Sequence, residues 1–253
     1  MDIKFLISTT ENTHSRCDII KSCWGKNQDV LFFTDTERKN RPEFIKVSDD
    51  KTWNSNIEKL TNALVYAYKN TTSDWYFLGC DDRYIFVDNL EEFLKDKNPK
   101  IPVCYGKIAK IPDFPEGYLN GAGNLCSRAA LEIIVYQIEN HPVFRPVPAE
   151  YNHHAADLYI GHLCRDSYAV EMGLEMIHCD LFHDHQPTLV GTDGSLHTLP
   201  LDSLPDATVE NDALRKYIGF HYIKSPQDFN SMVMIESGQT HHLVPTPSIG
   251  TDI

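Results

Sequence analysis

Short apolar runs alternate with amphipathic segments through the first third of the chain. The runs at 4–8, 29–35 and 75–79, which read KFLIS, DVLFFTD and WYFLG, have the length and composition of buried strands. Between them, apolar residues recur at helical spacing over 15–26 and 55–70. Strands that alternate with helices are typical of an open sheet covered by helices, so we expect an α/β fold.

The pattern continues less regularly after residue 83. It predicts further strands at 84–87, 102–107 and 216–223, and helices at 89–96, at 128–140 and in the first half of 155–170. Asp88 and Ser127 precede two of these helices and are residue types that cap helix N-termini. The stretch from Gly121 to Gly123 has little side-chain bulk, which predicts a tight turn.

Polar residues gather where the first predicted strands end. Thr9 and Thr10 follow the first strand, Asp35 ends the second, and Asp81 and Asp82 follow the third. In open α/β sheets, ligands bind outside the carboxyl ends of the strands. We therefore expect these side chains to lie along one ligand-binding edge.

The sequence DWYFLGCDDRYIFV places Asp81 and Asp82 between two apolar runs. Ionised carboxylates are costly to bury without partners, so these two need solvent, a cation or a hydrogen-bonding ligand. A turn that joins two strands usually offers Gly, Asn or Pro, whereas this one has Cys, Asp, Asp and Arg. The position favours a divalent cation that bridges two phosphates, because hard cations take oxygen ligands. The alternative is a turn with solvated carboxylates.

Histidines and a third carboxylate extend this hypothesis. The segment LFHDH places His183 and His185 two residues apart, so both imidazoles point to the same side of an extended chain. Imidazole with carboxylate is a usual mixed site for Mn²⁺, although the chain has 12 histidines and a surface role is the alternative. Asp157 stands near a predicted helix start, where a carboxylate is also favoured as a cap.

Composition limits the partners. Asp and Glu outnumber Lys and Arg by 36 to 23, the formal net charge is −13 and no basic block interrupts the chain. Nucleic acid and anionic membrane surfaces are therefore disfavoured as main partners. An acidic protein that handles phosphates needs a bound cation or locally placed donors. Seven cysteines without CxxC pairs argue against a structural zinc site or a disulfide framework.

The sequence also bears on location. No apolar window reaches the length of a membrane span, and MDIKFLISTT has too short an apolar core for a signal peptide. We expect a soluble, cytoplasmic chain. A Golgi-type protein trimmed of its membrane anchor is the alternative, since it would have the same features.

Five segments, in order, resemble those of the Fringe-like glycosyltransferases, a group of β1,3-transferases that includes core 1 galactosyltransferase. SRCDIIKSCWGKNQDVLFFTD resembles the opening helix and the strand after it, and DWYFLGCDDRYIFVDNL resembles the metal-binding strand. NGAGNLCSR resembles the glycine-rich turn, AADLYIG the catalytic segment, and LFHDH the Phe-His-x-His metal segment. The resemblance covers roughly the first three quarters of the chain.

The resemblance implies a GT-A fold, a UDP-sugar donor, Mn²⁺ or Mg²⁺, a glycan or glycoprotein acceptor, and inversion at the anomeric carbon. The transferred group would be a hexose or N-acetylhexosamine in β-linkage. The resemblance further implies that Asp82 and His185 hold the metal and that Asp157 is the catalytic base. It places the nucleotide sugar against Thr9, Thr10, Arg16, Asp35, Asp81, Gly121, Ala122 and Gly123.

Two residues depart from the family pattern, and two rival functions stay open. Cys80 stands where the family has the first residue of Asp-Asp-Asp, and Asn120 replaces the first glycine of the turn. A metal-dependent phosphohydrolase would also cluster Asp and His, although such sites usually need more ligands. A catalytically inactive carbohydrate-binding or interaction protein of the same fold is the other alternative.

The resemblance also suggests how the chain is organised. We expect 1–253 to form a single GT-A domain. Residues 1–110 would be its nucleotide-binding half and 111–240 its acceptor-side half, followed by a loose tail at 241–253.

Overall fold

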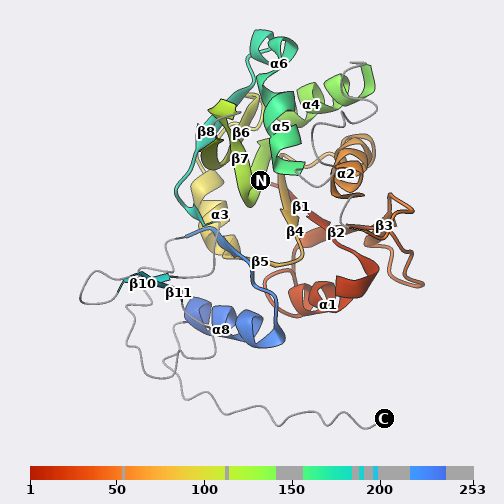
Figure 1. Ribbon diagram of the computed structural model, residues 1–253, viewed down its shortest axis with the longest axis vertical. Coiled ribbons are helices and arrows are strands. Elements are labelled where there is room, and N and C mark those ends of the chain that lie inside the picture. Colours follow the sequence, from red (N-terminus) through yellow and green to blue (C-terminus); the bar gives the residue numbers. More distant parts are fainter. Residues whose placement is uncertain are drawn as a thin grey trace.

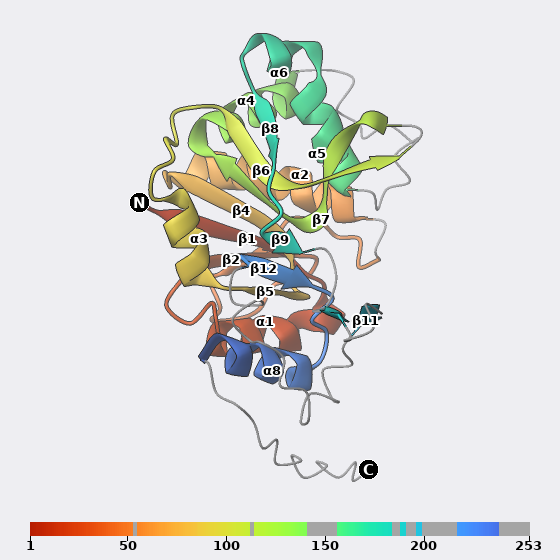
Figure 2. The same cartoon turned by 90° about the vertical axis from the view of Figure 1, so that its left-hand side faces the viewer.

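A mixed sheet with helices on both faces forms the body of the protein (Figures 1 and 2). The computed structural model describes residues 1–52, 55–111, 114–140, 156–183, 188–190, 196–198 and 217–237. Within these ranges the main sheet has seven strands in the order β3-β2-β1-β4-β7-β6-β8. They are β1 (Ile3–Ser8), β2 (Asp29–Thr34), β3 (Phe44–Lys46), β4 (Trp75–Cys80), β6 (Val103–Ile111), β7 (Phe114–Ser127) and β8 (Glu175–His178).

The N-terminal strands run in one direction. β1 is parallel to both β2 and β4, and β2 is parallel to β3. β7 is antiparallel to β4 and β6, whereas β8 is parallel to β6. Parallel strands end at the same edge of a sheet, so the loops that follow Ser8, Thr34 and Cys80 begin side by side.

Two helical layers explain why the strands are apolar without alternation. α1 (His14–Ser22), α3 (Val87–Leu94) and α8 (Pro226–Ser237) pack on the face that carries Phe5 and Phe77. α2 (Asn56–Asn70), α4 (Arg128–Asn140) and α5 (Ala156–Arg165) pack on the face of Leu6 and Leu78. Successive strand residues point to opposite faces, and here both faces are buried.

A small second sheet closes the first of these cores. β12 (Gly219–His221) pairs antiparallel with β5 (Arg83–Ile85) and parallel with β9 (Phe182–His183). Figure 2 shows β12 and β5 between the main sheet and the helices α1 and α8. Phe182 and Phe220 belong to the same core as Phe77. The chain after residue 216 is thereby joined to the segment that follows Asp82.

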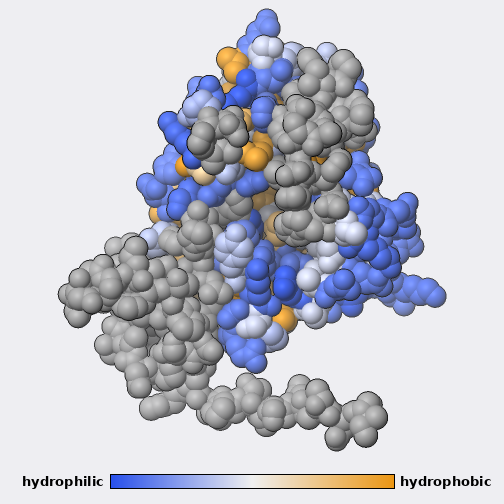
Figure 3. Space-filling view, in the orientation of Figure 1, coloured by the Kyte–Doolittle hydropathy of each residue, from blue (hydrophilic) through white to orange (hydrophobic). Residues whose placement is uncertain are grey.

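Short elements complete the described chain. The 3-10 turn η1 (Glu11–Thr13) precedes α1, α6 (Ser167–Glu171) follows α5, and β10 (Thr188–Val190) pairs with β11 (Leu196–Thr198). Among the described residues visible in Figure 3, hydrophilic ones predominate and apolar areas are small. Within the described ranges, no helix combines the length and the apolar character that crossing a membrane requires.

The predicted fold class is confirmed, since helices flank a mixed and mostly parallel sheet as expected for a GT-A fold. The Ser127 cap is also confirmed, because its Oγ accepts from the backbone N–H of Ala130 over 3.0 Å. The Asp88 cap is wrong: α3 begins at Val87, and Asp88 lies in its first turn. The division at residue 110 stays a prediction, and the tail at 241–253 lies outside the described residues.

The turn predicted at Gly121–Gly123 is wrong. These residues lie within β7, at an irregularity where its pairing with β6 jumps from Gly106↔Asn124 to Ile108↔Leu119. The extra residues on β7 form a bulge, which lets a strand change direction without ending. Small residues indicated a departure from regular backbone, but only the neighbouring strand determined its kind.

Candidate active site

The loops after β1 and β4 meet at one edge of the sheet. Ser8 pairs with Cys80 in the parallel register, so Thr9 and Asp81 begin neighbouring loops. A pocket of about 110 Å³ lies between these loops and α2. It is lined by Ser8, Thr9, Thr10, Thr13, Arg16, Thr52, Asn56, Lys59, Cys80, Asp81 and Asp82.

Asp81 joins the two loops. Thr9 Oγ1 donates to Asp81 Oδ2 over 2.6 Å, Thr13 donates to the same oxygen, and Arg16 Nη1 donates to Oδ1 over 3.1 Å. Burial raises the pKa of Asp81 above its ordinary value, although the bonds from Thr13, Thr9 and Arg16 act in the opposite direction. Since both oxygens are engaged, Asp81 positions the 9–16 loop and is poorly placed to bind a cation as well.

Asp35 does not line the pocket itself but contacts a residue that does, Lys59. Lys59 Nζ donates to Asp35 Oδ2 over 2.8 Å, and both side chains are buried. The backbone N–H of Glu11 donates to Asp35 Oδ1 over 3.0 Å. Burial works to raise the pKa of Asp35, but the bonds from Lys59 and Glu11 outweigh it and hold the pKa below its ordinary value. Ionised Asp35 therefore fixes Lys59, which lines the pocket.

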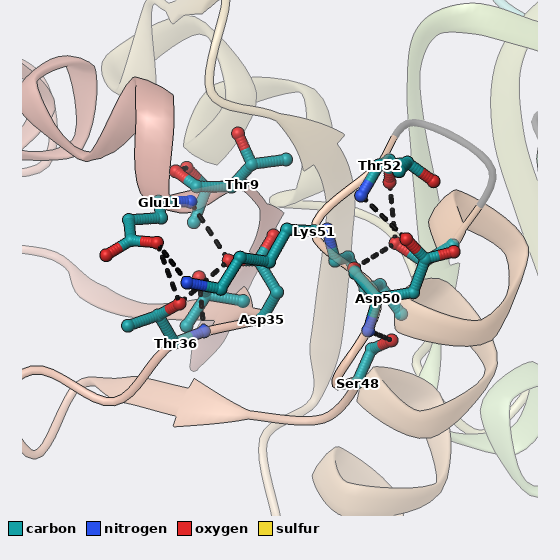
Figure 4. Close-up of polar contacts among 12 residues, drawn as sticks. Thr9, Glu11, Asp35, Thr36, Ser48, Asp50, Lys51 and Thr52 are labelled. Carbon is teal, nitrogen blue, oxygen red and sulfur yellow. Dashed lines mark hydrogen bonds and ion pairs between the residues drawn. The ribbon is translucent and has the colours of Figure 1, made fainter.

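An outer polar network brings the loop after β3 to the same edge (Figure 4). Lys51 forms an ion pair with Glu11, and Thr36 Oγ1 donates to Asp35 Oδ1 over 3.2 Å. The backbone N–H of Thr52, a pocket residue, donates to Asp50 Oδ1 over 2.7 Å. The Lys51–Glu11 pair is exposed and therefore adds little to stability. We infer that it positions the loop after β3.

Asp82 differs from Asp81 because one of its oxygens is not engaged. Oδ1 is buried and has no hydrogen-bond partner among the described residues, while Nε2 of His221 lies 3.3 Å away without hydrogen-bond geometry. Burial works to raise the pKa of Asp82, but His221 and the charges of Arg83 and Lys224 outweigh it and lower the pKa. Asp82 is therefore ionised at neutral pH with an oxygen available to a cation.

The small sheet holds Asp82 beside His221. His221 pairs with Arg83, the residue after Asp82, and the backbone N–H of Ile223 donates to the Asp82 carbonyl over 2.9 Å. Trp24 Nε1 donates to the Arg83 carbonyl over 3.1 Å and ties this strand to the end of α1. The carboxylate and the imidazole thus come from segments far apart in the sequence, joined by strand pairing.

Asp82 and His221 fit a metal-binding role. Burial and the nearby charge of Arg83 lower the pKa of His221, so its imidazole is neutral near pH 7 and can offer a lone pair. Carboxylate and imidazole together suit Mn²⁺. In the part of the chain that the structure describes, no group of three or more His, Cys, Asp or Glu is placed to hold a metal. A complete set of ligands would therefore need groups from outside these residues, whether from the rest of the chain, from the bound molecule or from water.

Asp157 faces the same region from α5. It lies in the first turn of this helix, and its Oδ1 accepts from the N–H of Leu158 over 3.1 Å. Its charge adds to the larger effect of burial in raising the pKa of both Cys80 and Tyr118. Cys80 lines the pocket, so the charge of Asp157 acts on a residue of that pocket.

Comparison with known proteins identifies the family. The model of the Fringe family, described as Fringe-like, matches residues 1–209. The chain belongs to the Fringe-like family. It is also 26% identical over 130 residues to glycoprotein-N-acetylgalactosamine 3-beta-galactosyltransferase 1 of Xenopus laevis. That match covers 50% of this chain and 36% of the relative, so the chain spans well under half of the relative's length.

Solved glycosyltransferase structures are similar at low sequence identity. One is a glycosyltransferase involved in the glycosylation of the major capsid of PBCV-1, with a TM-score of 0.46, 11% identity, and coverage of 92% of this chain and 98% of that one. Another is the galactosyltransferase LgtC in complex with donor and acceptor sugar analogues. Its TM-score is 0.43 at 9% identity, with coverage of 96% of this chain and 98% of that one.

Several predicted site residues of this Fringe-like chain lie together. Thr9, Thr10, Arg16, Asp81 and Asp82 line the pocket, and Asp35 holds a lining residue. Gly121 and Ala122 lie in β7 with Gly123. The predicted metal ligand His185 lies outside the described residues, so its role stays a prediction.

The departure at Cys80 leaves a neutral group in the pocket. Burial raises the pKa of its thiol to about 12, with a smaller opposing effect from Arg83. The side chain is therefore a thiol and not a thiolate at neutral pH, which argues against a nucleophile or a metal ligand. The site of this Fringe-like chain has one negative charge fewer than the family pattern implies.

Glycines 123 and 161 are required for different reasons. Gly123 has φ +114°, and an added Cβ would lie 2.7 Å from Cζ of Phe77. A Cβ on Gly161 would lie 2.5 Å from the Cβ of Tyr118 on β7. Close packing of α5 on β7 therefore explains the glycine at 161. At 123, both the positive φ and the close contact with Phe77 require glycine.

Sequence reasoning missed His221, Lys59 and Arg83. His221 had a recognisable signal, because KYIGFHYI carries one imidazole inside an apolar run, just as the carboxylates interrupt DWYFLGCDDRYIFV. Lys59 had none, since it stands among the polar positions of an amphipathic helix. Its burial depends on the Asp35 carboxylate from another strand.

Proposed function

We propose that this protein is a metal-dependent, inverting glycosyltransferase that moves a sugar from a UDP-sugar to a hydroxyl of a glycan or glycoprotein. The observation that carries the proposal is the buried Asp82 oxygen beside His221 at the edge of a polar pocket. Membership of the Fringe-like family supports it, as does the similarity to a galactosyltransferase over half of the chain.

Asp82 and His221 would hold Mn²⁺ or Mg²⁺ together with oxygens of the donor diphosphate. When bound, the cation would stabilise the negative charge that develops on the departing UDP. The proposal adds His221 to the predicted protein ligands, because its Nε2 lies 3.3 Å from the Asp82 carboxylate, and it keeps His185 as a predicted ligand. It also explains how a chain of net charge −13 binds an anionic donor.

Asp157 would act as the general base. Its carboxylate accepts the proton of the acceptor hydroxyl while that oxygen forms a bond to the anomeric carbon. The bond from this carbon to the diphosphate oxygen breaks, and its electron pair leaves with UDP. A single displacement from the opposite side inverts the configuration. Thr9, Thr10, Arg16 and Lys59 would surround the nucleotide, because they line the pocket beside Asp82.

Binding of UDP to the wild-type chain and three variants tests the metal site. In Asp82→Ala and His221→Ala, we expect the affinity for UDP in the presence of Mn²⁺ to fall about tenfold or more, because each change removes a protein ligand. His185→Ala tests the other predicted ligand in the same assay and should also weaken binding. The measurement is titration calorimetry with Mn²⁺ and with EDTA.

Two outcomes would contradict the proposal. UDP affinity that does not respond to EDTA would argue against a metal site, and a loss confined to Asp82→Ala and His185→Ala would remove His221 from the ligands. Incubation with UDP-sugars and a panel of acceptors then tests the reaction itself. Release of UDP or of phosphate at a rate independent of acceptor would favour a phosphohydrolase.

A further inference from the structure

Arg83 is a buried cation with two side-chain nitrogens that lack hydrogen-bond partners among the described residues. The residue is 2% exposed, and its Nε and Nη1 atoms have no hydrogen-bond partner among the described residues. No ion pair within the described ranges joins it to a carboxylate, although its charge is close enough to lower the pKa of Asp82. A buried, unpaired guanidinium is strongly unfavourable, so an anionic group that pairs with it would bind with a large advantage.

The Arg83 side chain lies against two glycines, Gly79 near the end of β4 and Gly123 within β7. A Cβ on Gly79 would be 2.8 Å from Arg83 Cδ and 2.9 Å from Nε, and a Cβ on Gly123 would be 3.6 Å from Nη1. A side chain at Gly79 would occupy the space that the arginine now fills. The glycines therefore let Arg83 lie flat against the sheet edge, next to the bulge in β7.

The same side chain lies beside the proposed metal ligands. Arg83 pairs with His221 across β5 and β12, and paired residues on neighbouring strands extend to the same side. Asp82 precedes Arg83 directly, and its free Oδ1 lies near His221. The single Asp82 carboxylate thus stands beside both the Arg83 cation and the His221 imidazole, so a second anion would be electrostatically favourable here.

We propose that Arg83 binds an anionic oxygen of the sugar-nucleotide donor, between the Asp82–His221 pair and the Gly123 bulge. The inference rests on the proposed function, since it assumes that a donor occupies this edge. Two sources supply such an oxygen: the β-phosphate of the nucleotide, or a carboxylate on the sugar of a uronic acid donor. A guanidinium is suited to either, because its N–H groups match carboxylate and phosphate geometry.

Arg83→Met tests the assignment, since Met keeps the length and removes the charge. Lys95→Met is the matched control, because Lys95 lies on the surface at the end of α3. The probes are UMP, UDP, UDP-glucose and UDP-glucuronate, each titrated by calorimetry with Mn²⁺ into wild type and both variants. Thermal melting of the ligand-free proteins is measured in parallel.

If Arg83 binds the β-phosphate, Arg83→Met weakens UDP and both UDP-sugars about tenfold or more and leaves UMP unchanged, as expected for a charge-assisted hydrogen bond. If it binds a sugar carboxylate, the loss is confined to UDP-glucuronate. In both cases the ligand-free variant melts at the wild-type temperature or above it, because an unpaired charge has been removed from the interior.

Equal affinities for all four probes in Arg83→Met and wild type would overturn the inference. So would a cooperative melting temperature well below that of wild type combined with unchanged affinities, which would make Arg83 structural. If Arg83→Met fails to melt cooperatively, Arg83→Gln gives the same comparison. Failure of the wild type itself to bind any uridine nucleotide would instead count against the proposed function.

Discussion

The carboxylates of the site differ in what their oxygens contact. Asp35 and Asp81 receive hydrogen bonds on both oxygens, from Lys59 and a backbone amide in one case and from two threonines and Arg16 in the other. Asp82 keeps one buried oxygen without a hydrogen bond. A carboxylate with hydrogen bonds to both oxygens positions its neighbours, whereas one with an oxygen that lacks a hydrogen bond can bind a cation or a ligand. Asp157 lies apart from these three in the sequence, in the first turn of α5.

Asp157→Asn tests the role of the base. The amide keeps the size of the side chain but cannot accept the acceptor proton, so we expect kcat to fall by roughly 10²- to 10⁴-fold, with UDP affinity unchanged. Asp166→Asn is the control, because Asp166 caps α6 and Asn caps equally well. Retained turnover in Asp157→Asn, measured as sugar transfer, would remove Asp157 from this role.

At the scale of elements, the position of Asp157 depends on how α5 packs on β7. Gly161 lies one turn after Asp157 and packs closely on Tyr118 of β7. A Cβ added at this glycine would lie only 2.5 Å from the Cβ of Tyr118. Arg165, at the end of the same helix, donates from Nε to the carbonyl of Gly117 over 2.8 Å. These contacts fix α5 against β7, and with it the position of the first turn, which carries Asp157.

Gly161→Ala should displace this helix. An alanine in a helix interior usually stabilises it by about 1 kcal/mol relative to glycine. Here the new Cβ would lie 2.5 Å from Tyr118, so we expect a net loss of roughly 1–3 kcal/mol from overpacking, together with slower transfer. Urea unfolding gives the free energy. A variant as stable as wild type would indicate that α5 can shift at no cost.

At the scale of the whole molecule, two charge effects oppose each other as the pH falls. The net charge of −13 becomes smaller, which relieves repulsion between like charges. Groups whose pKa values are lowered in the folded state act the other way, because the unfolded chain binds more protons. His14 is one such group: burial and the charge of Arg38 lower its pKa, and Nε2 contacts Thr34 Oγ1 at 2.8 Å.

His14→Gln should reduce the acid sensitivity of the fold. A lowered histidine pKa means that its contribution to stability is complete above the ordinary pKa of about 6.5 and is lost as the pH falls below it. We expect the free energy of unfolding to fall less between pH 7.5 and pH 5.5 in the variant than in the wild type. Urea unfolding at both pH values measures it, and identical pH dependence would contradict the assignment.

The sequence by itself determined the architecture and part of the site. Apolar runs such as KFLIS and WYFLG specify strands buried on both faces, and helical spacing in 55–70 specifies α2, because these signals are local and periodic. Polar residues at strand ends fall at one edge of a parallel sheet, so Thr9, Asp35 and the 81–82 pair were found without coordinates. The resemblance to the Fringe-like family depended on the same local segments.

Only the tertiary structure decided which groups face one another. It placed His221 beside Asp82, through a pairing between β5 and β12 that no local pattern encodes. It left one oxygen of Asp82 and two nitrogens of Arg83 without partners, and it turned the predicted glycine turn into a bulge. The physical reason is that hydrogen bonding, burial and strand register depend on residues far away in the chain, and these set the charge and reach of each side chain.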